Sequence, residues 1–430
     1  MKIKIIGAGL AGSECAFQLA QRGHAVDLFE MRPGKNTPAH RTGDLAELVC
    51  SNSFRSSAVT NAVGLLKAEM AMLGSLAIRC AGEARVPAGD AVAVDRERFA
   101  AAVTQAITSQ KTITLYRDEI TSLNPDGYDA LVVATGPLTS QPLFEAIDAF
   151  LGRDGLYFYD AIAPIVAADS LHVSKLYWKS RYDKGSGTDY LNAPMNREQY
   201  EAFVAALLSA ELHPLHDFER AVHFEGCLPI EEIAARGIDT LRFGPMKPVG
   251  LEHPETGARP WAVVQLRKED LSDDYFNLVG FQTKMKVPEQ KRVLQMIPGL
   301  EDCTFARFGS MHRNTFINGP RHLLPTFQTK RDPKIFFAGQ ITGVEGYVES
   351  AAVGLLVARY LEAPVPLPYH TALGALGRHV AESSPERYQP SNITWGVIED
   401  VVGRARKSDK RERQVARALA TIEALAAALV

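Results

Sequence analysis

The first thirty residues constrain the fold most strongly, because they combine recognisable segments in a fixed order. Lys2 to Ile6 is an apolar, β-rich run, and Leu10 to Arg22 has the spacing of apolar residues that is typical of a helix. Ala25 to Phe29 is a second apolar run, and it ends at the acidic residue Glu30. A glycine-rich turn separates the first strand from the helix. This order predicts the βαβ unit of a Rossmann-like α/β domain.

The turn before the helix predicts a bound dinucleotide. Its residues, all candidate contacts to the cofactor, are Gly7, Ala8, Gly9, Leu10, Ala11 and Gly12. In the dinucleotide fingerprint such glycines permit a tight turn, close approach of a pyrophosphate and close helix packing. The helix N-terminus stabilises the phosphates, and Glu30 is placed to accept hydrogen bonds from the ribose hydroxyls. An incidental glycine-rich turn is the alternative, and the strands on both sides disfavour it.

Two distant segments indicate which dinucleotide binds. Tyr128 to Ala134 and Lys334 to Ala338 are strand-like runs that each end in a turn, and a helix-like run from Ser350 to Leu361 follows the second. The turns add these candidate cofactor contacts: Thr135, Gly136, Gly339, Gln340 and Gly343. In flavoproteins of the two-dinucleotide-binding type the chain leaves the nucleotide domain and returns near its C-terminal end, and this layout is similar. The sequence therefore favours FAD over NAD.

At 430 residues the chain is long enough for two or three domains. We expect a discontinuous, Rossmann-like FAD-binding domain made of residues 1–150 and 310–365. A large inserted α+β domain for substrate and RNA is expected at 151–309, and a linker with a tail helix at 366–430.

Periodicity within these parts predicts several elements. The insert contains the strand-like runs LRFGPM, WAVVQL and YFNLVGF, and a helix-like stretch from Arg197 to Ala210. A proline-punctuated link follows Pro368, and Arg411 to Val430 is a predicted tail helix.

Composition excludes several classes of protein. Hydrophobic residues make up 46% of the chain and charged residues 23%, the balance of an ordinary globular protein. The formal net charge is −3, so any nucleic-acid site has to be a local patch. No run approaches the roughly 20 apolar residues that span a bilayer, so we expect no membrane partner. Five cysteines without a C-x-x-C pair argue against disulfides or a metal site, and favour a reducing, cytoplasmic location.

Two of the five cysteines are candidates for catalysis. Cys227 lies between a glycine and a leucine–proline pair in HFEGCLPIEE, where a loop can present its sulfur to a substrate. Cys50 lies in AELVCSNSFRSS, where polar neighbours and Arg55 favour a thiolate. Packing is the alternative for both, and it is the expected role of Cys15, Cys80 and Cys303.

Two ring-bearing residues near the C-terminal cofactor segment have a similar ambiguity. His312 lies in MHRNTFIN, which we interpret as a polar loop, and imidazole can stack on a planar heterocycle such as the flavin ring. Tyr347, in GVEGYVES, either packs against the sheet or faces that ring. A structural role is the alternative for each.

Basic residues gather in two stretches. Lys175 to Lys184 interleaves aromatic residues with positive charge, a pattern that suits contacts to an RNA backbone with stacked bases. The stretch 404–417 holds seven basic and two acidic residues. Both are candidate RNA contacts, and a solvated charged face is the alternative.

Together these segments resemble the folate-dependent tRNA (uracil-5-)-methyltransferase family, TrmFO, also called Gid. The resemblance covers residues 3 to about 355, in the order IIGAGLAGSE, FEMRP, TPAHRTGDLAELVCSNSFRS, NAVGLLKAEM, VPAGDAVAVDR, VVATGPLTS, YFYDAIAPIV, KSRYDKG, FEGCLPIE, FGPMKPVGL, VGFQTKMK, MHRNTFIN and FFAGQITGVEGYVESAA.

The resemblance implies a reaction. NAD(P)H reduces bound FAD, and 5,10-methylenetetrahydrofolate donates a one-carbon unit to uracil C5 in the T-loop of tRNA. Reduced flavin supplies the electrons that make this unit a methyl group. Because uracil C5 is a poor nucleophile, a thiolate must first add at C6, and a base must later remove the C5 proton.

The resemblance also assigns roles to residues. Cys227 corresponds to the nucleophile, and Cys50 to a second catalytic cysteine near the flavin that assists proton removal or resolution of the adduct. His312 matches the histidine that sandwiches the folate ring against the flavin, and Tyr347 matches an aromatic residue beside the flavin. The further contacts implied are Arg32 to the cofactor, and Arg181 and Lys184 to RNA or folate.

Other functions stay open. A flavin-dependent thiol oxidoreductase needs two neighbouring sulfurs, and Cys50 and Cys227 are 177 positions apart. Ribosomal RNA could be the target instead of tRNA, and an RNA-binding flavoprotein without catalysis is a third possibility. The related flavoprotein that modifies the wobble uridine of tRNA is longer, with a large C-terminal helical domain that 430 residues cannot hold.

Overall fold

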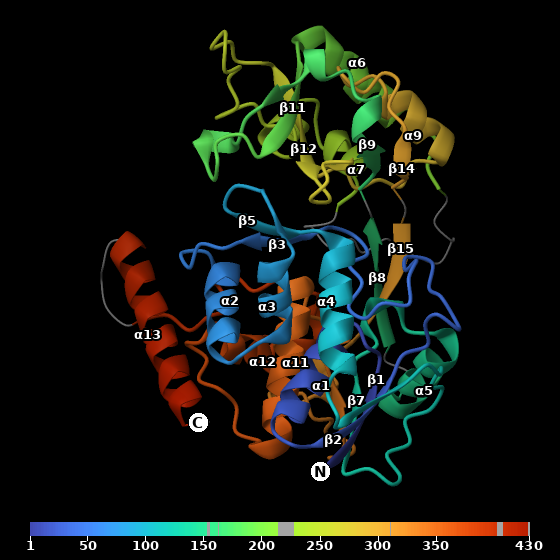
Figure 1. Cartoon of the computed structure of the whole chain (residues 1–430), viewed down its shortest axis with the longest axis vertical. Coiled ribbons are helices and arrows are strands. Elements are labelled where there is room, and N and C mark those ends of the chain that lie inside the picture. Colours follow the sequence, from blue (N-terminus) through green and yellow to red (C-terminus); the bar gives the residue numbers. More distant parts are fainter. Residues whose placement is uncertain (153–154, 162, 214–227, 310, 402–406, 429–430) are drawn as a thin grey trace.

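Five parallel strands form the sheet in the lower half of the molecule as drawn in Figure 1. The structure, a computed structural model, describes residues 1–152, 155–161, 163–213, 228–309, 311–401 and 407–428. In spatial order the strands are β16 (Ile335–Phe337), β7 (Ala130–Val133), β1 (Lys2–Ile6), β2 (Ala25–Phe29) and β6 (Ile113–Tyr116). The central strands carry apolar runs because a parallel sheet covered by helices buries both of its faces. The predicted strands at the N-terminus and after residues 128 and 334 are confirmed.

Helices surround this sheet. They are α1 (Leu10–Gln21), α2 (Ala62–Met72), α3 (Leu76–Glu83), α4 (Arg96–Thr108), α5 (Gln141–Leu151), α10 (Gly319–His322), α11 (Tyr347–Glu362), α12 (Ala372–Glu382) and α13 (Lys407–Ala427). The predicted helices at residues 10, 350 and 411 correspond to α1, α11 and α13. Helices α1 and α11 approach very closely, because a Cβ at Gly354 would lie 2.2 Å from the carbonyl oxygen of Ala11. The C-terminal part of the chain thus packs directly on the glycine-turn helix.

A six-stranded antiparallel sheet lies above the parallel sheet in Figure 1. Its strands, in spatial order, are β10 (Tyr177–Trp178), β11 (Tyr190–Met195), β12 (Ala262–Lys268), β13 (Tyr275–Leu278), β9 (Ile165–Ala167) and β14 (Phe305–Arg307). Its helices are α6 (Arg197–Leu208), α7 (Ile230–Ala235), α8 (Thr240–Phe243) and α9 (Val287–Leu294). The predicted strands WAVVQL and YFNLVGF and the helix from Arg197 are confirmed.

Two smaller sheets join these parts. Strands β8 (Gly155–Ala161) and β15 (Met311–Ile317) pair in antiparallel fashion and run between the two large sheets (Figure 1). Strands β3 (Ser53–Ser56), β5 (Ala91–Val94) and β4 (Arg85–Val86) form the other small sheet. Short 3-10 turns complete the description: η1 (Gly136–Leu138), η2 (Ala168–Ser170), η3 (Val173–Lys175), η4 (Arg181–Asp183), η6 (Gln340–Thr342) and η7 (Pro385–Arg387).

Buried apolar side chains form two large clusters. One is built on the parallel sheet and takes in helices α11, α12 and α13 from the C-terminal part of the chain. The other lies between the antiparallel sheet and helices α6 to α9. Each large sheet therefore has a core of its own.

Three sequence predictions were wrong. LRFGPM was expected to be a strand, but it forms α8 and a turn, in which Arg242 lies over the ring of Trp261 at 3.6 Å. The segment of His312 was expected to be a loop, but it is strand β15. The stretch after Pro368 was expected to be a link, but it contains α12, whose first N–H groups are held by the carboxylate of Glu69 on α2. Contacts elsewhere in the chain accompany the first two elements, whereas α12 also has a local cap, since the hydroxyl of Thr371 accepts the N–H of Gly374.

Candidate active site

The glycine turn between β1 and α1 has the geometry of a phosphate-binding loop. Gly7 has a φ of +95°, which favours glycine, and a Cβ there would lie 2.6 Å from the carbonyl oxygen of Ala134. A Cβ at Gly12 would lie 1.8 Å from the carbonyl oxygen of Gly7. A Cβ at Gly9, by contrast, would meet nothing within 4 Å. Two glycines are thus required for packing, while the third leaves open space at the helix N-terminus where a phosphate can approach.

Glu30 lies at the end of β2, beside this turn. Its carboxylate accepts hydrogen bonds from the backbone N–H of Ala8 at 3.1 Å and from Nε of Arg32 at 2.9 Å. Burial opposes ionisation of Glu30, but the hydrogen bonds and charge of Arg32 outweigh it and keep the pKa below its ordinary value. The ionised carboxylate is suited to accept hydrogen bonds from ribose hydroxyls.

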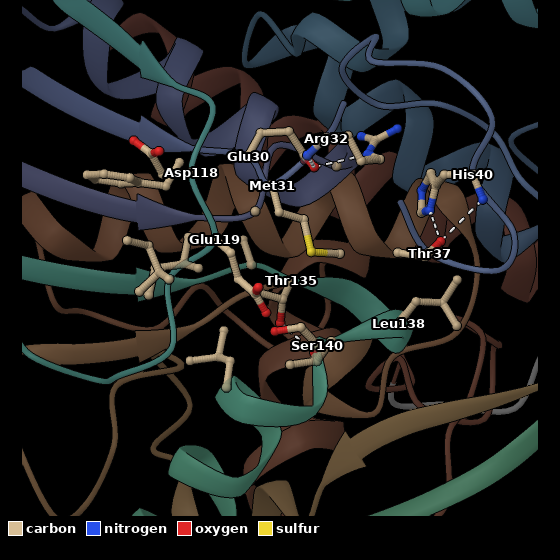
Figure 2. A pocket seen from close by; sticks show the side chains of 18 residues that line it. Glu30, Met31, Arg32, Thr37, His40, Asp118, Glu119, Thr135, Leu138 and Ser140 are labelled. Atoms are coloured by element: carbon tan, nitrogen blue, oxygen red, sulfur yellow. Dashed lines mark hydrogen bonds and ion pairs between the residues drawn. The ribbon is translucent and has the colours of Figure 1, made fainter. Parts of the chain in front are cut away.

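A cleft opens next to the turn (Figure 2). Its lining includes Gly7, Gly9, Glu30, Met31, Arg32, Thr37, His40, Glu119, Thr135, Leu138 and Ser140. Burial and then the charge of Arg32 lower the pKa of His40 to about 4, so its imidazole is neutral. Ligand sites are commonly clefts in which a few polar groups converge, and the side chains of Glu30 and Thr135 give this cleft that character. Together with the open space at Gly9, it shows that these residues fit a dinucleotide.

The other predicted cofactor contacts come from the two strands on the far side of β1. Thr135 and Gly136 follow β7, while Gly339, Gln340 and Gly343 follow β16. The carboxyl ends of neighbouring parallel strands meet at one edge of a sheet, which is where ligands bind in folds of this kind. A Cβ at Gly339 would lie 2.6 Å from Cβ of Ala11, so this turn packs closely on the helix of the glycine turn. The sequence-predicted residues are thus brought together at one edge.

Cys50 and Tyr347 are in direct contact. Sγ of Cys50 lies 3.0 Å from the hydroxyl oxygen of Tyr347, at the start of α11. That oxygen also accepts the backbone N–H groups of Cys50 at 2.9 Å and Ser51 at 3.1 Å. Burial raises the pKa of Tyr347 well above its ordinary value, so the phenol keeps its proton. The sequence predicted both residues separately as site candidates, but not their contact.

The segment that carries Cys50 is tied to the antiparallel sheet. Arg267, on β12, donates from Nε to the side-chain oxygen of Asn52 at 2.9 Å and from Nη2 to Oγ of Ser51 at 3.0 Å. Nδ2 of Asn52 in turn donates to the carbonyl oxygen of Lys268 at 2.9 Å. The thiol therefore lies where the two large sheets meet.

Two arginines that sequence reasoning missed lie near this thiol. Arg96, at the start of α4, donates to the carbonyl oxygen of Leu48 at 2.9 Å and to the carboxylate of Glu269 at 2.7 Å. Burial, followed by the charges of Arg96 and Arg41, lowers the pKa of Arg307 to about 10. No local signal marks either residue, because the groups they meet lie far away in the sequence.

The predicted RNA or folate contacts at Arg181 and Lys184 are engaged within the protein. Arg181 donates to the carbonyl oxygens of Lys247, at 2.9 Å, and of Val249. Lys184 forms an ion pair with Asp90, in which the lysine is half exposed. Arg181 thus braces a loop of the protein, whereas Lys184 stays accessible at the surface.

Two predicted site residues are described only in part or not at all. Cys227 lies outside the described residues. The segment after it is anchored, since Ile230 is buried and its N–H donates to the carbonyl oxygen of Gln282 at 2.7 Å. For His312 the structure gives the backbone, which pairs with that of Asp160 in β8.

The remaining cysteines are buried in the two cores. Burial raises the pKa of Cys15 far above its ordinary value, that of Cys80 to about 11 and that of Cys303 to about 12. These thiols pack as expected, and Cys50 is the more exposed of the described cysteines. Within the described ranges we find no cluster of three or more side chains able to hold a metal ion, and no helix long and apolar enough to cross a membrane.

The fold and the cleft define the class of the protein. A parallel sheet with a glycine turn after β1, an acid after β2 and an inserted antiparallel sheet make a dinucleotide-binding fold of the kind found in FAD-dependent oxidoreductases. The structure of Aquifex aeolicus GidA in its form I crystal shares this fold, with a TM-score of 0.70 over 99% of this chain and 76% of that chain, at 14% sequence identity.

Sequence comparison identifies the family. The model of the family described as glucose inhibited division protein A matches residues 2–365. The methylenetetrahydrofolate–tRNA-(uracil-5-)-methyltransferase TrmFO of Heliobacterium modesticaldum is 54% identical over 99% of this chain and 97% of its own length. The protein of the same name from Geobacter sulfurreducens is 55% identical over 98% of both chains. The chain belongs to the glucose inhibited division protein A family and, within it, to the TrmFO proteins.

Proposed function

We propose that this chain is a methylenetetrahydrofolate–tRNA-(uracil-5-)-methyltransferase that forms 5-methyluridine in the T-loop of tRNA. The observation that carries this proposal is identity above 50% along nearly the whole chain to proteins of that name. The cleft beside the glycine turn and the thiol between the two sheets support it, because the reaction needs both a redox cofactor and a sulfur group near it.

Residues 1–150 and 310–365 hold FAD. The glycine turn and the helix N-terminus of α1 bind its phosphates, and Glu30, oriented by Arg32, binds a ribose. The turns after β7 and β16 supply Thr135, Gly136 and the contacts at Gly339, Gln340 and Gly343. Bound FAD, reduced by NAD(P)H, supplies the electrons that turn the folate-borne one-carbon unit into a methyl group.

Two thiols of the chain act on the uracil. The thiolate of Cys227 adds at C6, which makes C5 nucleophilic toward the one-carbon unit of 5,10-methylenetetrahydrofolate. The thiolate of Cys50 then accepts the C5 proton, so that the C6–sulfur bond breaks and Cys227 is released. Cys50 is suited to this step because it is partly accessible at the junction of the two large sheets.

The inserted part, residues 151–309, receives RNA and folate. His312, which follows the inserted part in the sequence, holds the folate ring, and Lys184 within the inserted part contributes positive charge at the surface. Arg181 acts there by bracing the loop at residues 247 to 249. Residues 366–430 support the FAD-binding part, since α12 and α13 share its core. The protein works in the cytoplasm, which fits a sequence whose five cysteines form no C-x-x-C pair.

One experiment tests the function. Purified FAD-loaded protein is incubated with an unmodified T-loop transcript, 5,10-methylenetetrahydrofolate and NADPH, and 5-methyluridine is measured by mass spectrometry of nucleosides. We expect one methyl group per transcript at the T-loop uridine. Absence of product while NADPH still reduces the bound FAD would refute the proposal. Methylation of a ribosomal RNA fragment alone would show that ribosomal RNA, and not tRNA, is the substrate.

A paired variant tests the nucleophile. Cys227→Ala should abolish both methylation and covalent trapping of a transcript that contains 5-fluorouracil, because no thiolate adds at C6. Cys303→Ala, a buried thiol in the same part of the chain, is the matched control and should retain both. If trapping persists in Cys227→Ala, the nucleophile is assigned wrongly.

A further inference from the structure

The hydroxyl of Tyr347 has a fully determined set of hydrogen bonds. Its oxygen lies within hydrogen-bond distance of the backbone nitrogens of Cys50 and Ser51 and of Sγ of Cys50. Backbone N–H groups can only donate, and a phenolic oxygen has two acceptor positions and one proton. Since the two N–H groups fill both acceptor positions, the remaining contact, to sulfur, must use the phenolic proton.

The sulfur of Cys50 is therefore the acceptor in this contact. A thiol sulfur is a weak acceptor, whereas a thiolate is a strong one, so a donated O–H stabilises the thiolate more than the thiol. The hydroxyl of Tyr347 is fixed in its orientation toward Sγ, because its oxygen is held by the same backbone segment that carries Cys50.

The charges around Cys50 also favour the thiolate over the thiol. Arg96 from α4 is paired with Glu269, and Arg267 from β12 is bound to the polar side chains next to the thiol. Arg307 from β14 forms no ion pair with a carboxylate of the described residues. This leaves an excess of positive charge near Cys50 and Tyr347, which favours an anion there.

We propose that Tyr347 is a positioning residue that holds Cys50 as a thiolate, by donating its phenolic hydrogen bond to Sγ while two backbone N–H groups fix its oxygen. Arg307 adds to this effect through its charge. The proposal deepens the proposed function and rests on it, since it identifies what prepares Cys50 to accept the C5 proton of uracil.

The test is the pH dependence of alkylation of Cys50 in the FAD-loaded protein. Iodoacetamide reacts with thiolates, and the tryptic peptide 42–55 contains Cys50 as its one cysteine, so mass spectrometry reports this site alone. In Tyr347→Phe we expect the midpoint of the profile to move up by about one pH unit, which is a roughly tenfold slower reaction at pH values below the midpoint. The rates should converge at high pH, where every form is a thiolate.

Two further variants keep the test decisive. Arg307→Gln leaves the Tyr347 contacts in place and should shift the midpoint the same way by a smaller amount, about threefold in rate below the midpoint. Tyr360→Phe is the matched control, because it removes a buried hydroxyl from the same helix α11 that bonds only to the N–H of Leu367 among the residues described. It should leave the profile unchanged.

The result that overturns the proposal is an unchanged midpoint in Tyr347→Phe with FAD retained, or an equal shift in Tyr360→Phe. If Tyr347→Phe fails to fold, an unchanged midpoint in Arg307→Gln overturns the electrostatic part. The alkylation profile needs no RNA. If the wild type does not methylate RNA but the profile shifts in Tyr347→Phe, the proposed function is refuted and the role of Tyr347 stands. If the wild type methylates RNA but the profile does not shift, the role of Tyr347 is refuted and the proposed function stands.

Discussion

Replacement of Arg267 by methionine should loosen the segment that carries Cys50. Arg267 is buried, and its guanidinium makes two hydrogen bonds from β12 to Ser51 and Asn52, at 3.0 and 2.9 Å. Methionine keeps much of the side-chain volume but removes both donors. The oxygen of Asn52, itself a buried residue, then loses its partner.

The size of the effect follows from these contacts. A hydrogen bond from a charged donor contributes about 1.5–3 kcal/mol, so two contribute about 3–6 kcal/mol. Removing the guanidinium also removes the cost of burying its charge, which offsets a large part of this sum. We expect a net loss of about 2 kcal/mol in the free energy of local opening, which corresponds to about a 30-fold larger open population.

Hydrogen exchange measured by mass spectrometry is the assay, because local opening exposes the backbone amides of residues 50–53. Exchange in this segment should be about 30-fold faster in Arg267→Met, with little change in the parallel sheet. Lys268→Met is the matched control: the neighbouring side chain points to the other face of the strand and pairs with the exposed Asp273 at 2.6 Å. Such a surface pair contributes about 0–1 kcal/mol. The reasoning would be refuted if this segment exchanged equally fast in both variants, or if its exchange in Arg267→Met were no faster than in the wild type.

Three other predictions follow from buried or crowded groups. Gly12→Ala puts a Cβ 1.8 Å from the Gly7 carbonyl oxygen and should abolish FAD retention, measured by the visible absorbance of the flavin. Gly82→Ala, where a Cβ meets nothing within 4 Å, should keep FAD and raise the free energy of unfolding by up to about 1 kcal/mol. Burial raises the pKa of Glu69 to about 7, so the wild type should lose stability as the pH rises from about 4.5 through 7; Glu69→Gln should flatten this decline in melting temperature, and an unaltered slope would contradict the assignment. Arg181→Lys should lower the free energy of unfolding by about 1–2 kcal/mol, because lysine cannot reproduce the directed hydrogen bonds to residues 247 and 249. Lys184→Ala should change the free energy of unfolding by less than about 1 kcal/mol and reduce RNA affinity in a filter-binding assay. The reverse pattern would exchange their roles.

Elements whose stabilising contacts are local were predicted well from the sequence. The glycine turn is an example, because the clash that requires Gly12 is with Gly7, five residues earlier. Strand β12 and helix α6 also match their predicted runs, since α6 begins with a capping box between Asn196 and Gln199. Such contacts leave a readable pattern in consecutive residues.

Elements that depend on distant partners were predicted poorly. Helix α12 has a local cap, in which the hydroxyl of Thr371 accepts the N–H of Gly374 at 2.9 Å, but its first two N–H groups are held by Glu69, about 300 positions earlier. Strand β15 was taken for a loop because its pairing partner β8 lies about 150 positions earlier. No short window of consecutive residues contains the contact of Glu69 with α12 or the pairing of β8 with β15.

The same distinction applies to the candidate site. The sequence by itself determined the βαβ unit, the dinucleotide class of the ligand and the acid at Glu30, because steric and hydrogen-bond demands within about thirty residues fix them. Only the tertiary structure decided what surrounds Cys50. The phenol of Tyr347 and the guanidinium groups of Arg96, Arg267 and Arg307 reach the neighbourhood of this thiol from four separate elements. The chemical character of Cys50 is therefore set by hydrogen bonds and charges that come together only when both large sheets have folded.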